Sequence, residues 1–592
     1  MRLERLLAAV AALVFISFAT AAEAGAYKNF RAAIYITVGD TKKLADPAEF
    51  AREFARVHSQ LDFDKVYIEA YRNHEFATDA ELDAVKREFQ ARGIATSGGV
   101  TLAAGGSGGQ FGTFDYENPV DRAECERAVR LIARHFDEVI LDDFFFYTSK
   151  SDADIAAKGA RSWTDYRLAK MNEAARDLVL GPAKQENPRV RVIIKYPNWY
   201  EHFHGLGYDL AGEAHAFDAI YTGTETRDPV ITDQLLQQYE SYEIYRYLSN
   251  VRSGANLGVW VDTYDIRAID RYAEQLWGGL FAKAPEQMLF EWSAMASDKP
   301  AVPGSRPWAK QQTSFRWPVA GGNGWASAAN EALHIADGVL GELGNPVGVA
   351  SYRPPHATGE DFLHNYIGNL GVPIELYPGY PTAAHSILLT QAAASDPAII
   401  GKIDTSLRGG ANVIVTSGFL EAMQGRGFSQ LAEWQATGHT IAIGQYFDGF
   451  GAGRGKELSE PGKTAAVLFP EVRFYTNDSW GIIRGVAAAK GFPIVLMNHY
   501  SKGTLYLWTV PENFGDLYKL PRPMVTRIKQ YLFADLPVQI DAPDHVALFT
   551  YDNGAFIVEN FRDDAASVQV QRKGQAAETV AISPHSFRLF KR

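Results

Sequence analysis

The chain has 592 residues, of which 46% are hydrophobic and 22% charged, and its formal net charge is -12. A chain of this length exceeds what one hydrophobic core serves, so we expect several domains. The acidic balance and the lack of a basic block argue against nucleic acid or an anionic membrane as partner. The single cysteine, Cys125, excludes an internal disulfide and a cysteine-rich metal site.

The first 24 residues have the pattern of a secretory signal peptide. Arg2 and Arg5 supply positive charge, residues 6–21 are mostly apolar, and Ala22 to Ala24 form a small-residue cleavage signal. An uncleaved membrane anchor is the alternative. We expect cleavage near Ala24, a periplasmic or secreted protein, and no membrane contact afterwards, because no later segment is long and apolar enough to span a bilayer.

From residue 28 to residue 297, short apolar strands alternate with amphipathic helices. The expected strands cover residues 32–38, 65–70, 94–102, 139–141, 190–195, 217–221, 257–262 and 287–292. Eight such units over about 270 residues are typical of a (β/α)₈ TIM barrel, with a doubly wound open sheet as the alternative. Closure requires the strand at 287–290 to pair with the strand at 32–35.

Three further segments follow the barrel. Residues 298–330 contain many prolines and glycines and are expected to be a linker. Residues 331–535 alternate helices with strands at 346–350, 373–377, 386–389, 412–415, 440–443 and 503–508, which predicts a flavodoxin- or amidotransferase-like α/β domain. Residues 536–592 predict a small β-sandwich, in which Asp552-Asn553-Gly554 turns a hairpin.

Acidic residues follow several of the expected barrel strands, and the clearest case is Asp142-Asp143 after an apolar run. The carboxyl ends of barrel strands converge on one mouth, where active sites lie. Crowded carboxyl groups raise one another's pKa, so one stays protonated while another is ionised, as glycoside cleavage requires. Because side chains alternate along a strand, we expect Asp142 to face the mouth and Asp143 to support it. Other acids at strand ends are Glu69, Glu225, Asp262 and Glu291.

Aromatic and polar residues in the same loops are candidates for substrate binding, because sugar C–H faces stack on aromatic rings. This set comprises Glu69, Tyr71, Lys195, Asn198, Trp199, Arg227, Asp262 and Trp292. The alternative for any single acid is a helix N-cap or an ion pair. Metal binding is a second alternative, with His202 and His204 as a weak zinc signal, but we expect neither a metal nor a cofactor.

Two resemblances to glycoside hydrolases support this interpretation. The sequence from Phe136 to Asp142 resembles the fourth-strand motif of retaining α-galactosidases and dextranases, which implies Asp142 as nucleophile and Glu225 as acid/base. Asp143 and Glu291 are the further catalytic candidates. The domain order is similar to family 42 β-galactosidases and implies a homo-oligomer, with a trimer as the first expectation. Those enzymes have Asn-Glu at the fourth strand, where this chain has Asp142-Asp143.

The sequence thus predicts an exported glycosidase that cleaves a poly- or oligosaccharide with two carboxyl groups. The resemblance favours retention of configuration, and inversion stays open. Amidotransferase chemistry in the second domain is excluded, because it uses a cysteine thiolate and Cys125 lies in the barrel segment. The competing hypothesis is a catalytically silent polysaccharide-binding or exopolysaccharide-assembly protein.

Overall fold

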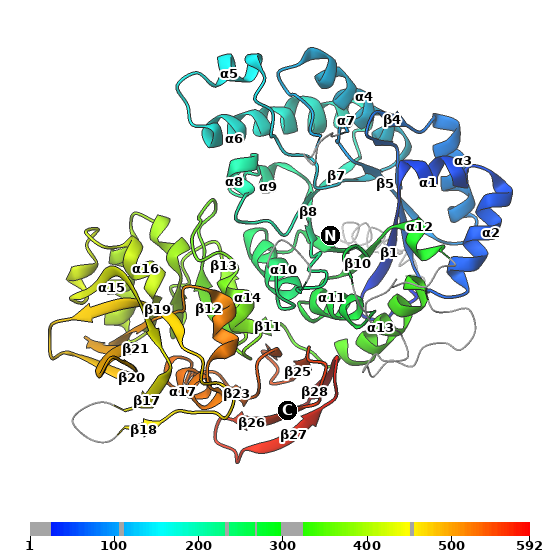
Figure 1. The fold of residues 1–592 in the computed structure, drawn as a ribbon. Coiled ribbons are helices and arrows are strands. Elements are labelled where there is room, and N and C mark those ends of the chain that lie inside the picture. Colours follow the sequence, from blue (N-terminus) through cyan, green and yellow to red (C-terminus); the bar gives the residue numbers. More distant parts are fainter. Residues whose placement is uncertain (1–24, 106–111, 231–235, 267–268, 298–323, 450–454) are drawn as a thin grey trace, which may run out of the picture.

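The computed structural model describes residues 25–105, 112–230, 236–266, 269–297, 324–449 and 455–592 (Figure 1). The expected signal peptide and most of the expected linker lie outside these ranges. Within them, no helix combines the length and the apolar character that crossing a membrane requires.

The first domain is a closed barrel of parallel strands, as the sequence predicts. Ala32 lies opposite Gln287 and Tyr35 opposite Phe290, so the first and last strands pair in the expected register. The strands are β1 (Arg31–Ile36), β2 (Lys65–Glu69), β5 (Ala95–Val100), β6 (Glu138–Leu141), β7 (Arg191–Tyr196), β8 (Ala219–Gly223), β9 (Asn256–Val261) and β10 (Glu286–Phe290).

Helices surround the barrel (Figure 1). Local sequence sets where they begin: α3 follows a capping box made by Thr78 and Glu81, and α4 follows the N-cap Asn118. α4 turns Cys125 and its apolar neighbours at helical spacing toward the strands. The main helices are α2 (Pro47–His58), α3 (Asp79–Gln90), α4 (Pro119–His135), α6 (Trp163–Ala174), α10 (Glu240–Val251) and α11 (Ile269–Phe281).

The middle domain is built on a mixed sheet. Its parallel half consists of β13 (Ile374–Tyr377), β12 (Val349–Tyr352), β14 (Ser386–Leu389), β15 (Asn412–Thr416) and β22 (Gly503–Trp508). An antiparallel half continues the sheet with β21 (Lys490–Tyr500), β20 (Ser479–Ala487), β17 (Gln445–Asp448) and β18 (Lys456–Glu457).

One expected strand of this domain has a different place. Residues 440–443 belong to β16 (Trp434–Ile443), which pairs antiparallel with β19 (Val467–Phe474) in a separate two-stranded sheet. Placing them in the parallel sheet was wrong, because a short apolar run does not distinguish a buried parallel strand from one arm of a long hairpin.

The C-terminal domain is a β-sandwich whose two sheets enclose one apolar core. One sheet contains β24 (Val546–Tyr551), β25 (Phe556–Asn560) and β28 (Ser586–Phe590), and the other β23 (Val538–Asp541), β26 (Ala566–Arg572) and β27 (Glu578–Ile582). The predicted hairpin turn joins β24 to β25, with Gly554 at φ 83°. β11 (Pro346–Val347), expected in the α/β domain, pairs instead with β24.

Candidate active site

A cavity of about 310 Å³ opens at the carboxyl ends of the barrel strands. The structure brings eight of the expected site residues to its wall: Asp142, Asp143, Lys195, Asn198, Trp199, Glu225, Arg227 and Asp262. Arg72, Phe144, Trp260, Tyr264 and Phe290 complete the lining. The cavity therefore joins side chains from six different strand ends.

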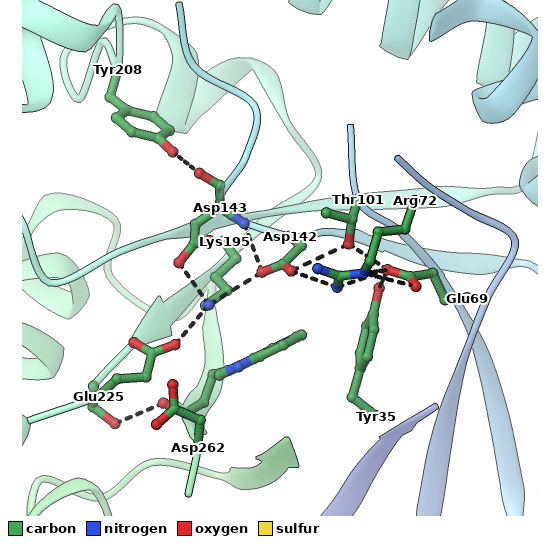
Figure 2. A network of polar contacts seen from close by, with 12 residues as sticks. Tyr35, Glu69, Arg72, Thr101, Asp142, Asp143, Lys195, Tyr208, Glu225 and Asp262 are labelled. Atoms are coloured by element: carbon green, nitrogen blue, oxygen red, sulfur yellow. Dashed lines mark hydrogen bonds and ion pairs between the residues drawn. The ribbon is translucent and has the colours of Figure 1, made fainter. Parts of the chain in front are cut away.

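Lys195 lies at the centre of this wall (Figure 2). It is the fifth residue of β7, and its buried ammonium group donates to Asp143 Oδ2 at 2.7 Å, Glu225 Oε1 at 2.8 Å and Asp142 Oδ1 at 3.2 Å. The ring of Trp260 lies 4.2 Å from the same nitrogen. An ammonium has three donors, so the three carboxyl groups use all of them.

Asp142 is held in its ionised form. Burial alone would raise the pKa of Asp142, but the charges of Lys195 and Arg72 outweigh it and hold the pKa below its usual range. Arg72 donates to Oδ2 at 3.0 Å and Thr101 donates to the same oxygen at 3.2 Å, while the Asp143 amide donates to Oδ1 at 2.8 Å. Both oxygens of Asp142 are therefore engaged.

Asp143 and Glu225 are held closer to protonation. Burial raises the pKa of Asp143 to about 7 against the opposing charge of Lys195, and Asp142 and Glu225 add to the rise. Burial also raises the pKa of Glu225, again opposed by Lys195. Among the described residues each group uses one carboxyl oxygen in its contact with Lys195, and no contact engages the other.

The shared nitrogen limits how far apart these carboxyl groups lie. Bonds of 3.2 Å and 2.8 Å to one atom place the nearest oxygens of Asp142 and Glu225 no more than about 6 Å apart. Retaining glycosidases separate their two carboxyl groups by about 5–5.5 Å and inverting ones by roughly 6.5–9.5 Å. The upper limit of about 6 Å is therefore close to the carboxyl separation of retaining enzymes.

The expectation that strand alternation would turn Asp143 away from the mouth was wrong. β6 ends at Leu141, Asp142 follows it directly, and the turn begins at Asp143. Alternation of side chains holds along an extended strand and does not apply in a turn. Both aspartates therefore reach Lys195.

The remaining wall is held by Asp262 and Arg227. Arg227 donates to Asp262 through Nε at 3.1 Å and Nη2 at 2.7 Å, a two-pronged ion pair between the ends of β9 and β8. The backbone amide of Tyr264 also donates to Asp262. The carboxylate of Asp262 is thereby paired with Arg227. The backbone of Arg227 has a φ of 58°.

Four of the expected residues lie outside the cavity lining. Glu69 is buried beneath it, where it accepts hydrogen bonds from Tyr35 and from Arg72, and so it supports Arg72. Tyr71 donates to Glu124, and the indole of Trp292 donates to Glu53. Both rings are buried, so they present no face to a substrate, and their expected binding role was wrong.

Glu291 is the fourth of these residues. Phe290 lines the cavity at the end of β10, and Glu291 follows it at the N-cap of the short helix α12 (Trp292–Met295). Its Oε1 accepts a hydrogen bond from Ser293 at 2.8 Å. The structure thus places Glu291 at a helix start, where its side chain makes no capping hydrogen bond to the helix.

The histidines considered for zinc are not part of the cavity lining. His202 contacts Glu201 at 3.3 Å, and the ring of His204 lies 6.3 Å from that of His356. In the described part of the chain, no three or more His, Cys, Asp or Glu side chains are arranged to hold a metal ion.

Arg72 is a charged residue of the cavity wall that sequence reasoning missed. It lies in β3 (Tyr71–Arg72), just past the end of β2, and bridges Glu69 and Asp142. Its signal was available in the sequence, as a cation three residues after a strand-end acid.

Three family models match consecutive parts of the chain. A probable glycosyl hydrolase catalytic domain matches residues 19–341, the second domain of uncharacterized protein SSO3021 matches residues 344–513, and a probable glycosyl hydrolase C-terminal domain matches residues 537–580. The curated protein SSO3021 of Saccharolobus solfataricus is 27% identical over 297 residues, which are 45% of this chain and 49% of that protein. The match thus spans about half the length of this relative.

Solved structures resemble the whole architecture. The β-galactosidases of Rahnella sp. R3 and of Bacillus circulans sp. alkalophilus give TM-scores of 0.61 and 0.60 at 10% identity, covering 95% of this chain and 98% and 99% of theirs. Gan42B, a GH42 β-galactosidase, gives 0.61 at 10% identity and covers 95% of this chain and 99% of its own. At this identity the likeness concerns the fold, and it confirms the expected family 42-like order of barrel, α/β domain and β-domain.

Proposed function

The chain belongs to the family of probable glycosyl hydrolases, and from this premise we propose that its barrel cleaves glycosidic bonds of an oligo- or polysaccharide. The observation that carries the proposal is the set of three carboxyl groups on Lys195. Their shared environment lowers the pKa of one carboxyl group and raises the pKa of the other two, which sets the pKa values of neighbouring acids apart in a single cavity.

We assign the nucleophile to Asp142 and the acid/base to Glu225. The lowered pKa of Asp142 favours the ionised form that a nucleophile needs, and the raised pKa of Glu225 favours the protonated form that an acid catalyst needs. The spacing of no more than about 6 Å between their nearest oxygens favours retention. Asp143 is the second candidate for either role, because no contact with the described residues engages its second oxygen and its pKa is about 7.

Kinetics of Asp142→Asn, Asp143→Asn and Glu225→Gln test the assignment. We expect the first and third to lower kcat on aryl glycosides by about 1,000-fold, since each removes a reacting carboxyl group. Asp137→Asn is the matched control, because Asp137 precedes the same strand at the opposite end of the barrel and is exposed. Near-normal turnover in Asp142→Asn would contradict the assignment and make Asp143 the candidate nucleophile.

Azide separates the two roles on an activated aryl glycoside. In Asp142→Ala, azide should attack the substrate directly and give a glycosyl azide of inverted configuration. In Glu225→Ala, azide should attack the glycosyl-enzyme and give the retained configuration. The same product from both variants contradicts the assignment. Binding of glycans without hydrolysis across a broad panel would instead support the silent binding protein.

Export and oligomerisation complete the proposal. The sequence of residues 1–24 supports secretion, and N-terminal sequencing of the mature protein should begin near Gly25. The family 42-like domain order supports a trimer assembled through the middle domain. If light scattering shows a monomer at micromolar concentration, the proposed oligomer is contradicted.

A further inference from the structure

The carboxylate of Glu69, buried beneath the cavity, accepts hydrogen bonds from several segments of the barrel (Figure 2). Its Oε1 accepts from Tyr35 at 2.8 Å and from the Thr101 hydroxyl, and its Oε2 accepts from the Val38 amide at 2.7 Å. Arg72 completes the set through Nε, which lies 3.2 Å from Oε1 and 3.1 Å from Oε2. All of these partners are donors, so the position suits a carboxylate, which only accepts, better than an amide, which also donates.

Arg72 connects this buried acid to Asp142. Its Nη2 lies 3.0 Å from Glu69 Oε1 and 3.0 Å from Asp142 Oδ2, so one nitrogen, with its two hydrogens, serves both carboxylates. Thr101 also lies between the two acids, but its hydroxyl has a single hydrogen and serves one of them at a time. Of these two donors, Arg72 is therefore the one that holds both acids at once.

The carboxylate of Asp142 is anchored through both of its oxygens. The Asp143 amide donates to Oδ1 at 2.8 Å, and Arg72 donates to Oδ2. The terminal torsion of an aspartate is broad, so a carboxylate with one anchor can still rotate. With two anchors it keeps one orientation relative to Glu225. This matters because a displacement of about 1 Å in a reacting group can cost about 100-fold in rate.

We propose that Glu69 and Arg72 form a positioning pair for the nucleophile Asp142, in which Glu69 fixes the guanidinium and the guanidinium fixes the orientation of the carboxylate. Neither residue of the pair exchanges a bond with the sugar. The side chain of Glu69 is 0% exposed, so it acts through Arg72 and does not touch the substrate. The inference rests on the proposed function, since it takes Asp142 as the nucleophile.

Two substitutions of Arg72 separate geometry from charge. Arg72→Lys keeps the positive charge but loses the planar fork, so it cannot hold Glu69 and Asp142 together in a fixed geometry. We expect kcat on an aryl glycoside to fall about 100-fold, KM to change less than about threefold, and the acidic limb of kcat/KM to stay in place. Arg72→Met also removes the charge. Its acidic limb should move to higher pH, because Arg72 helps to keep the pKa of Asp142 low.

Glu69→Gln tests the other member of the pair, because its amide turns N–H groups toward partners that are themselves donors. We expect a similar loss of kcat, and the double variant with Arg72→Lys should be no worse than the poorer single variant, since residues that act as a unit are not additive.

Arg246→Lys is the matched control. Arg246 also pairs with a buried acid, Glu375, and its side chain is 16% exposed, but it lies outside the cavity lining. This control should leave kcat and the pH profile unchanged. Circular dichroism checks that each variant is folded, and the two Arg72 variants decide the question even if Glu69→Gln prevents folding.

Three outcomes would overturn the inference. One is near-normal kcat in Arg72→Lys. Another is a raised KM with unchanged kcat, which would make Arg72 a substrate-binding residue. The third is an equal shift of the acidic limb in both Arg72 variants, which would leave charge as its only role. Asp142→Asn is measured beside them: if it is inactive while Arg72→Lys is fully active, only this inference fails, whereas an active Asp142→Asn contradicts the nucleophile of the proposed function.

Discussion

Lys195 carries its charge into a cavity wall that holds three carboxyl groups, and so it decides which of them is ionised. The pKa of Lys195 is raised, because the three acids outweigh the effect of burial on its ammonium group. The same attraction is what lowers the pKa of Asp142 against burial. Although sequence analysis expected Lys195 to bind substrate, its three donors are already committed to the protein's own carboxyl groups.

We expect Lys195→Met to move the pH profile as well as reduce activity. Without the ammonium group the pKa of Asp142 rises, so a higher pH is needed to ionise the nucleophile. The acidic limb of kcat/KM should therefore shift to higher pH, with about a 100-fold loss at neutral pH, each pKa unit costing up to tenfold on that limb. The profile is measured on an aryl glycoside between pH 4 and 9.

Lys65→Met is the matched control for this change. Lys65 is also buried and pairs with Glu138 at 2.6 Å and Glu286 at 3.3 Å, but at the opposite end of the barrel. Both variants leave buried carboxyl groups unpaired and should lose stability, by about 3 kcal/mol for a broken buried pair. The role assigned to Lys195 is contradicted if the acidic limb of the pH profile does not shift in Lys195→Met, or if it shifts equally in Lys65→Met.

The acids of the site could be predicted from sequence because parallel barrel strands end at one mouth. Asp142 and Glu225 come from strands that are not neighbours along the chain, yet topology alone brings them together. What sequence could not give is the direction of side chains in the turns after the strands. Asp143 turns into the cavity, whereas Tyr71 and Trp292 turn into the core, and these outcomes depend on tertiary contacts.

At the scale of elements, burial on both faces made the barrel strands predictable. β7 and β10 are buried along almost their full length, and each contains a short apolar run, residues 192–194 and 288–290. β20 and β21, in contrast, mix buried and exposed residues and pair through irregular registers at Gly481 to Arg484. Their pattern fits neither a buried run nor a clean alternation, so the antiparallel half of the middle sheet was not foreseen.

Helix α10 joins the barrel to the middle domain through a buried ion pair. Arg246 donates to Glu375 on β13 at distances down to 2.6 Å, and Asn250 donates to the same carboxylate at 2.7 Å. Glu375 is 2% exposed, so removing its partner would leave a buried charge. The contact therefore fixes the orientation of the barrel and the middle domain relative to each other.

We expect Arg246→Ala to lower the free energy of unfolding by about 3 kcal/mol, since the carboxylate of Glu375 loses its counter-charge in a buried place. Urea unfolding followed by tryptophan fluorescence measures the change. Adding Glu375→Gln should recover part of the loss, because the amide carries no charge. Arg189→Ala is the control: Arg189 is 81% exposed, pairs with Asp137 at 3.4 Å, and should cost under about 1 kcal/mol. Equal losses in both variants would contradict the argument.

At the scale of the whole molecule, α10 also brings two buried acids to the contact with the middle domain. Burial raises the pKa of Glu243 to about 8, and burial together with the charge of Glu243 raises the pKa of Glu240 well above its usual value. His364 on α14 (Leu363–Gly368) lies 3.6 Å from Glu243, and burial lowers its pKa to about 3. Arg353 and Glu201 are the other charged groups nearby.

These shifts predict that alkali weakens the molecule. A group whose pKa is raised on folding stabilises the native state fully below its unfolded pKa, and this contribution is lost as the pH rises through the folded value. For Glu243 the loss runs from about pH 4.5 to about pH 8. His364 acts in the opposite sense but only below pH 6.5, so it does not mask the effect above that pH.

We therefore expect the free energy of unfolding to fall between pH 6.5 and 9, by up to about 1.4 kcal/mol per pH unit for each acid that ionises. Urea unfolding at half-unit pH steps gives the slope. Glu240→Gln with Glu243→Gln should reduce the slope by the contribution of two groups, because neither amide titrates, while acids such as Glu213 and Asp143 continue to contribute. Glu213→Gln is the control, since burial raises the pKa of Glu213 to about 8 but its partner Tyr196 lies within the barrel. Glu213→Gln should reduce the slope by the contribution of one group only. If the double variant keeps the wild-type slope, the acids that titrate in this pH range are not Glu240 and Glu243.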